Sequence, residues 1–193
     1  MVISTLTLLF VQVTSHNNFS KLHIYEPVPV FYKNLERVWS DHVKTNHWDV
    51  NVYNYGLGDT TRTILLSEAD LKGQGTFGMK NNEADNAKKI SLEIIDATTV
   101  FNNVTGGSGD LDLLHVNCEG CEYEMLENLI KSGLHWKIKI IQFGTHFFPE
   151  VPRLTERYCA IRSELSQSHR MVYGTAFAWE RWDSLGYSFD YDT

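Results

Sequence analysis

The chain has 193 residues, of which 42% are hydrophobic and 21% are charged. These values are typical of a folded domain with a substantial core and exclude a disordered chain. The formal net charge of -7 argues against a nucleic-acid partner, because nucleic-acid-binding domains present a basic face.

The first 13 residues are apolar but too few to form a stable membrane span. Two interpretations stay open for them. We favour a buried first strand, because their β-branched content is typical of a central parallel strand. The alternative is the apolar part of a signal peptide within residues 1–15, which would place the protein in the secretory pathway lumen or outside the cell, whereas a strand favours the cytoplasm. We expect an N-terminal apolar segment over 1–20, one domain over 21–185 and a tail over 186–193.

Strand and helix patterns alternate along the rest of the chain. Apolar alternation and apolar runs predict strands at Lys21–Tyr25, Asp49–Tyr55, Thr61–Ser67, Lys89–Ile95, Asp110–Cys118, Trp136–Phe143 and Arg170–Trp179. Helical spacing predicts one helix that begins at Pro29, one over 97–103, one after Gly120 and one from Leu154 to Leu165. This alternation favours an α/β fold with a doubly wound, mostly parallel sheet.

Two polar residues lie at the carboxyl ends of predicted strands, where open α/β sheets bind ligands. Glu26 follows the strand over 21–25, and its carboxylate could accept two hydrogen bonds from a ribose diol. An exposed turn acid is the alternative. His146 follows the strand over 136–143, so it is a candidate proton acceptor or substrate contact, or otherwise a partly buried packing residue.

Residues 110–127, a predicted strand followed by a turn and a helix, are the most informative part of the chain. His115, Asn117 and Glu119 lie on one side of that strand, and polar groups there are costly unless they are paired or used. Gly120 lets the backbone turn tightly and lets a ligand approach closely. In the alternative interpretation, Glu119 and Glu122 only stabilise the dipole of the following helix.

Cys118 and Cys121 form a C-x-x-C motif between a strand and a helix. A redox dithiol could occupy this position, and His115 would add a third soft metal ligand, although a structural zinc site needs four. Two small buried cysteines are the better interpretation, and we predict no metal site.

Several separated segments resemble the FkbM-type methyltransferases. Leu22–Pro29 looks like the strand-two motif of that family, and Leu113–Leu126 resembles its hallmark, which usually reads Leu-Lys-Ile-Asp-Val-Glu-Gly-Ala-Glu. Further similarity, in part to animal members, lies in Asn51–Gly58, Gln142–His146, Arg157–Arg162 and Trp179–Trp182. The resemblance extends from about residue 21 to about residue 183.

This resemblance implies a class I, Rossmann-like fold that uses S-adenosylmethionine to methylate oxygen on a small-molecule or glycan acceptor. Carried over by position, Glu26 would hold the ribose, and Asn117 and Glu119 would flank the methionine end and the acceptor. His115 stands where many members carry Lys. His146 and Glu119 are the implied catalytic residues, with His146 as a base.

Two departures from the family pattern accompany the resemblance. Asn117 replaces the usual Asp, and no glycine precedes Gly56, so the loop after the first strand is missing. The segment before Lys21 is also too short for a crossover helix. We therefore expect an incomplete N-terminal part, as in a truncated or spliced form. Two other functions stay open, a non-catalytic binding or scaffold domain that keeps the fold and a C-x-x-C dithiol protein.

Overall fold

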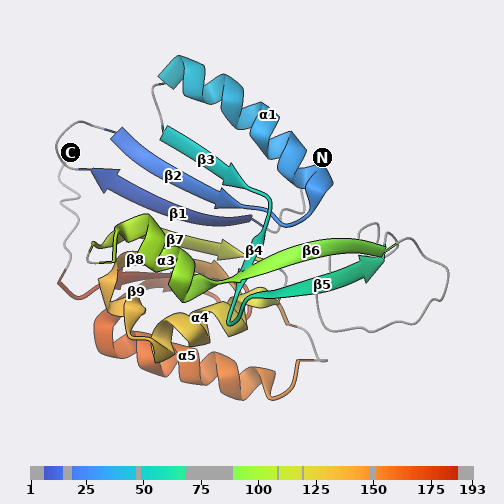
Figure 1. The fold of residues 1–193 in the computed structure, drawn as a ribbon. Coiled ribbons are helices and arrows are strands. Elements are labelled where there is room, and N and C mark those ends of the chain that lie inside the picture. The colour runs from blue at the N-terminus through green and yellow to red at the C-terminus, as the bar shows by residue number, and fades with distance from the viewer. Residues whose placement is uncertain are drawn as a thin grey trace.

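The computed structural model describes residues 7–14, 19–46, 49–67, 89–107, 109–118, 120–147 and 151–186. The elements in chain order are β1 (Thr7–Thr14), β2 (Phe19–Tyr25), α1 (Pro29–Asn46), β3 (Asp49–Tyr53), β4 (Gly56–Gly58), β5 (Arg62–Ser67), β6 (Lys89–Asp96), α3 (Ala97–Thr105), β7 (Leu111–Asn117), α4 (Cys121–Lys131), the 3-10 helix η1 (Leu134–Lys137), β8 (Ile138–Gly144), α5 (Leu154–Ser168), β9 (His169–Gly174) and β10 (Trp179–Ser184). The predicted α/β fold is confirmed (Figure 1).

Seven of the described strands form the main sheet in the order β3-β2-β1-β7-β8-β10-β9. The pairs β2–β3 and β7–β8 are parallel, whereas β1 is antiparallel to β2 and β7, and β10 is antiparallel to β8 and β9. It follows that β2, β3, β7, β8 and β9 run in one direction and β1 and β10 in the other. Most strands of the sheet therefore run in the same direction, which agrees with the predicted mostly parallel sheet. Most neighbouring strands nevertheless pair in antiparallel fashion, because the two reversed strands lie between the others.

The first strand occupies the centre of the sheet, but its direction differs from the prediction. β1 and β2 form an antiparallel hairpin in which Thr14 pairs with Phe19, so only residues 15–18 connect them. A parallel connection needs about a dozen residues or more, so this chain can only turn back. The expectation of a central parallel first strand was wrong for this physical reason.

The predicted strand over Arg170–Trp179 was also wrong, because the chain reverses within it. β9 ends at Gly174 and β10 begins at Trp179, and the two pair in antiparallel fashion. The turn is closed by the backbone N–H of Thr175, which donates to the carbonyl of Trp179 at 3.0 Å. The two ends of the segment Arg170–Trp179 therefore belong to two different strands, and its middle is a turn.

A small second sheet has the order β4-β6-β5 and lies beside the main sheet (Figure 1). Its short strand β4 contains Gly56 and Gly58, and a Cβ atom at either position would come within 2.9 Å of the Ile94 side chain or closer. A side chain at either position would therefore require the Ile94 side chain to move.

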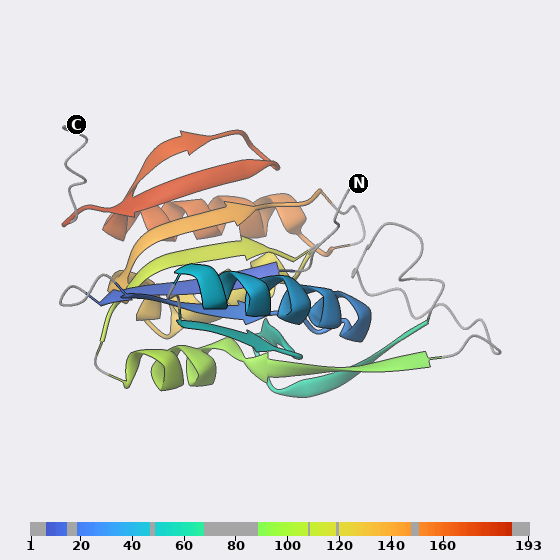
Figure 2. The same cartoon turned by 90° about the horizontal axis from the view of Figure 1, so that it is seen from above.

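The helices cover the two faces of the main sheet unequally. α1 lies on one face above β2 and β3, and α4 and α5 lie on the opposite face (Figures 1 and 2). Figure 2 looks onto β7, β8, β10 and β9 from the α1 side, where no described helix lies over them. The core therefore forms between the sheet and the second helix layer. Its most deeply buried side chains there include Leu114, Val116, Leu126, Leu129, Ile141, Phe143, Ile161 and Leu165.

Candidate functional site

The carboxyl ends of the parallel strands meet at one edge of the main sheet. Glu26 follows the end of β2, Asn117 ends β7, and His146 lies two residues after the end of β8. The start of β1 reaches the same edge, because Thr7 pairs with Asn117. The sequence-predicted residues Glu26, Asn117 and His146 therefore share an edge, as expected for a ligand site of an α/β sheet.

Glu26 is completely buried at this edge. Its backbone N–H donates to the carbonyl of Tyr53 at 3.0 Å, and its side-chain Oε1 accepts from the N–H of Val28 at 2.8 Å. Its Oε2 is also buried and has no hydrogen-bond partner among the described residues. Burial raises the pKa of the Glu26 carboxyl to about 8, although the bond from Val28 acts in the opposite direction. A turn acid exposed to solvent, the alternative interpretation of Glu26, does not describe this geometry.

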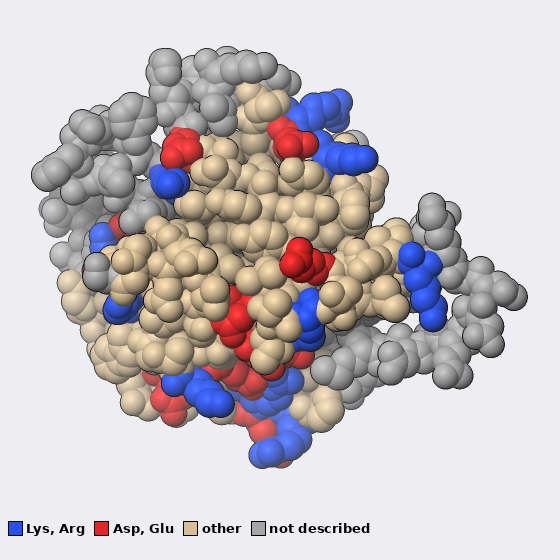
Figure 3. Space-filling model, in the orientation of Figure 1, with Lys and Arg blue, Asp and Glu red and all other residues tan. Residues whose placement is uncertain are grey.

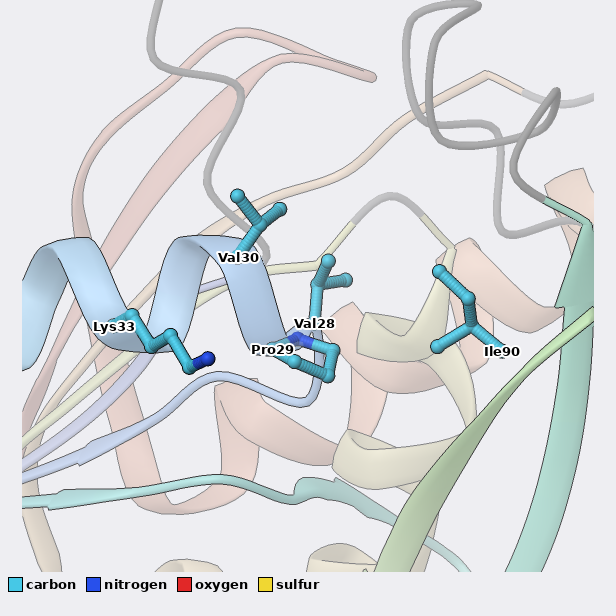
Figure 4. A pocket seen from close by; sticks show the side chains of 5 residues that line it. All are labelled: Val28, Pro29, Val30, Lys33 and Ile90. Carbon is cyan, nitrogen blue, oxygen red and sulfur yellow. The ribbon is translucent and has the colours of Figure 1, made fainter.

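A cavity of about 270 Å³ lies at the start of α1 (Figure 4). Its lining residues are Val28, Pro29, Val30, Lys33 and Ile90. In Figure 4 the Ile90 side chain from β6 faces Val28 and Pro29 across the cavity. Val28 lines the cavity, and its backbone N–H donates to Oε1 of Glu26, which lies two residues before it. The sequence analysis missed this cavity, since β6 lies far from α1 along the chain.

The turn between β7 and α4 holds the second group of candidate residues. Asn117 is half-buried, and Gly120 adopts a φ of 114°, a backbone conformation that side-chain-bearing residues rarely adopt. The N–H of Gly120 donates to Oε2 of Glu122 at 2.7 Å. Glu119, which we predicted to be both catalytic and cofactor-binding, lies outside the described residues.

Glu122 and His146 form a partly buried pair at the same edge. Oε1 of Glu122 lies 3.1 Å from Nδ1 of His146 and also accepts from the His146 backbone N–H at 2.8 Å. The Glu122 side chain is 0% exposed and that of His146 is 30% exposed. The Tyr123 hydroxyl donates to the His146 carbonyl at 3.0 Å. The His146 backbone is thus held on both sides, while its ring reaches the surface.

The sequence analysis missed the role of Glu122, which it interpreted only as an acid in the first turn of a helix. A signal was present, because Glu122 shares its helix face with Met125 and Leu126, which are core residues. A carboxylate on a buried face must find donors, so its position predicts a polar partner from another element.

Cys118 and Cys121 are joined by a disulfide across this turn. The Cys118 Sγ atom lies 3.5 Å from Oε2 of Glu122, so the disulfide packs directly against the buried carboxylate. With both thiols bonded to each other, neither is available as a metal ligand beside His115. Among the described residues, no group of three or more His, Cys, Asp or Glu side chains could hold a metal ion.

His115 lies on β7, two residues before Asn117. It projects from the face of β7 without a covering helix, where its Nδ1 lies 3.2 Å from Oε1 of Gln142 and its ring stacks on Trp179 at 5.3 Å between centroids. The Trp179 ring in turn lies over Gly144, where a Cβ atom would come within 3.3 Å of it. The side-chain partners of His115 in the described part of the chain therefore come from β8 and β10.

Charged side chains on the face in Figure 3 lie mainly over the lower part, where α4 and α5 are found in Figure 1. Opposite charges pair there, with Arg62 bound to Glu124 at 2.5 Å and Arg157 bound to Glu127 at 2.6 Å. On the described part of this face the positive charges therefore form no continuous basic surface. None of the described helices is long and apolar enough to cross a membrane.

Comparison with known proteins identifies one family over most of the chain. Residues 6–173 match the family model described as the Methyltransferase FkbM domain. A crystal structure of Methyltransferase FkbM from Methylobacillus flagellatus KT aligns with a TM-score of 0.49 and 12% sequence identity, over 82% of this chain and 35% of that chain.

Weaker similarity is found to the heat-inducible transcription repressor HrcA of Lactococcus lactis. The protein of subsp. cremoris strain SK11 is 26% identical over 129 residues, which cover 64% of this chain and 37% of the repressor. The protein of subsp. lactis strain IL1403 is 26% identical over 147 residues, which cover 72% of this chain and 42% of the repressor. The chain spans less than half the length of each protein that it matches.

Proposed function

Because the chain belongs to the Methyltransferase FkbM domain family, we propose that it binds S-adenosylmethionine at the carboxyl edge of the main sheet and methylates an oxygen of a small-molecule or glycan acceptor. The observation that carries this proposal is the buried Oε2 of Glu26, which has no hydrogen-bond partner among the described residues. A buried acceptor of this kind is stabilised by a hydroxyl donor, and a ribose supplies one.

The surroundings of Glu26 support a nucleoside at this position. The apolar cavity at Val28 and Ile90 has room for a ring, and Glu26 would hold the ribose beside it. Asn117 and Glu119 would flank the methionine end, with His115 further along the same strand. His146 would accept a proton from the acceptor. Bound S-adenosylmethionine would supply an electrophilic methyl group, so the protein itself needs mainly to align the reacting atoms.

One part of the edge does not fit the family pattern. The reversed β1 brings its first residue, Thr7, to the carboxyl edge, whereas the family places the glycine loop after the end of this strand. We infer that the β7–α4 turn supports the methionine end. A transcriptional role like that named for HrcA is not proposed, because the net charge of -7 opposes binding to DNA.

Calorimetric titration with S-adenosylhomocysteine tests the cofactor assignment. At a pH above 8, where Glu26 is ionised, we expect binding by the unsubstituted chain and an affinity at least about tenfold lower for Glu26→Gln, because a charge-assisted hydrogen bond contributes about 1.5–3 kcal/mol. Glu93→Gln, an exposed acid on β6, is the matched control and should bind unchanged. Equal affinity of Glu26→Gln and the unsubstituted chain would refute the ribose assignment. No binding by a folded chain would instead indicate a domain that keeps the fold without the chemistry.

A further inference from the structure

We propose that Glu122 is a positioning residue that fixes the orientation and tautomer of the His146 ring as a proton acceptor. This inference rests on the proposed methyl transfer, in which His146 would take the proton of an acceptor hydroxyl. A carboxylate acceptor is already deprotonated at neutral pH and needs no base, whereas a hydroxyl holds its proton until a base removes it.

The geometry of the pair determines which ring nitrogen accepts. Oε1 of Glu122 lies 3.1 Å from Nδ1 of His146, and a carboxylate oxygen accepts hydrogen bonds. The proton of the neutral ring is therefore placed on Nδ1, and Nε2 becomes the accepting nitrogen. Carboxylates that bind one imidazole nitrogen orient the other in the same way in hydrolytic triads.

The hydrogen bonds and the burial of the Glu122 side chain make this arrangement rigid. Its two oxygens accept from two different segments, since Oε2 binds the N–H of Gly120 at 2.7 Å and Oε1 binds the N–H of His146 at 2.8 Å. The disulfide from Cys118 to Cys121 closes the turn that contains Gly120. With Glu122 completely buried, water does not compete for these bonds, and the carboxylate cannot turn away from the ring.

The proton and electrons balance in the proposed step. The acceptor hydroxyl gives its proton to Nε2 of His146 while its oxygen lone pair forms the new bond to the methyl carbon. The carbon–sulfur bond of the sulfonium donor breaks, and its electron pair stays on sulfur. The imidazolium that results is stabilised by the Glu122 carboxylate, and its proton later passes to water.

The tautomer of His146 is directly measurable without any acceptor. Long-range nitrogen–proton NMR of the full chain at alkaline pH should show the Nδ1–H form, whereas a neutral imidazole in water prefers Nε2–H. Glu122→Gln keeps an acceptor oxygen and should retain the Nδ1–H form. Glu122→Met removes the acceptor at similar length and should shift the ring to Nε2–H. Glu124→Gln, which changes an acid of the same helix paired with Arg62, should change nothing.

The spectrum of the unsubstituted chain alone can overturn the positioning role, even if Glu122→Met does not fold. A ring that carries its proton on Nε2 in that chain contradicts the proposal, as does a folded Glu122→Met variant that keeps the Nδ1–H form. If Glu122 contributed only to folding, either tautomer of His146 would be compatible with that role. S-adenosylhomocysteine should bind Glu122→Gln as tightly as the unsubstituted chain, so loss of cofactor binding and loss of ring orientation are distinguishable.

The acceptor class has its own readout. Methyl-labelled S-adenosylmethionine is incubated with the chain and a pool of extracted small molecules, and the labelled products are treated with alkali and with hydriodic acid. Methyl ethers survive alkali and release methyl iodide in hydriodic acid, which is the expected result. Label that alkali releases as methanol would identify methyl esters and would overturn the hydroxyl acceptor, as would the absence of any alkali-stable label.

Discussion

Thr7, the first residue of β1, pairs with Asn117, the last residue of β7. This antiparallel pair brings the start of β1 to the carboxyl edge, and Thr14 at the other end pairs with Phe19 at the opposite edge. The strand between β2 and β7 is therefore present, but it ends at Thr14, at the edge opposite to Glu26. The consequences of this arrangement for the site are testable.

The first prediction concerns the pH dependence of cofactor affinity. Burial raises the pKa of Glu26 to about 8, so the carboxyl group is largely protonated at neutral pH before ligand binds. A ribose hydroxyl donates better to the carboxylate, so binding favours loss of this proton. Affinity for S-adenosylhomocysteine should rise as pH increases towards 8 and level off above it, as measured by calorimetry. The affinity of Glu26→Gln should lack this rise, and an equally steep rise in that variant would exclude Glu26 as the source.

The second prediction concerns the disulfide between Cys118 and Cys121. Reduction should lower the free energy of unfolding by about 2 kcal/mol, because the bond closes a short loop in the unfolded chain. Urea denaturation with and without reductant measures the difference. A Cys118→Val, Cys121→Ala double variant is the control and should not respond to reductant. A reductant effect of equal size in that variant would assign the change to something other than this bond.

The third prediction concerns the hydrogen bond from the Tyr123 hydroxyl to the His146 carbonyl. Tyr123→Phe removes the hydroxyl that donates to the His146 carbonyl and leaves a partly buried acceptor without this donor. The free energy of unfolding should fall by about 1–2 kcal/mol, as measured by chemical denaturation. Tyr32→Phe on α1 removes an exposed hydrogen bond to Glu36 and should cost much less. An equal loss of unfolding free energy in the two variants would show that the hydrogen bond from Tyr123 to His146 contributes no more than an exposed one.

The fourth prediction concerns stability in acid. Burial lowers the pKa of His169, whose Nε2 donates to the Ile138 carbonyl at 2.8 Å and whose Nδ1 lies 2.6 Å from the Ser168 hydroxyl. The unfolded chain binds a proton at the ordinary pKa of 6.5, so acidification favours unfolding. The contribution of His169 to stability should be complete above pH 6.5 and decline as pH falls below it.

Denaturation midpoints at a series of pH values measure this dependence. His169→Gln should be less stable than the unsubstituted chain above pH 6.5, and the difference should narrow as the pH falls below it. A constant difference across the series would contradict the assignment to His169.

The strand-end residues were predictable because the strand pattern and the carboxyl-edge rule are both local. Glu26, Asn117 and His146 were named from their positions after apolar runs, and the structure brings them to one edge. The role of Glu122 was not predicted, because its partner His146 lies 24 residues away in the sequence. The two residues meet only because folding brings the β7–α4 turn and the end of β8 to the same edge of the sheet. His115 was placed at the cofactor by position in the family pattern, and its neighbours Gln142 and Trp179 were not foreseen.

The sequence by itself determined the alternation of strands and helices, the family and the residues that end each strand. Apolar periodicity, turn residues and motif spacing are local properties and are visible in one chain. Only the tertiary structure decided the direction of β1, the burial of Glu26 and the pairing of Glu122 with His146. Each of these depends on contacts between segments far apart in sequence, and the free energy of burying a polar group is set by the partners that those contacts supply.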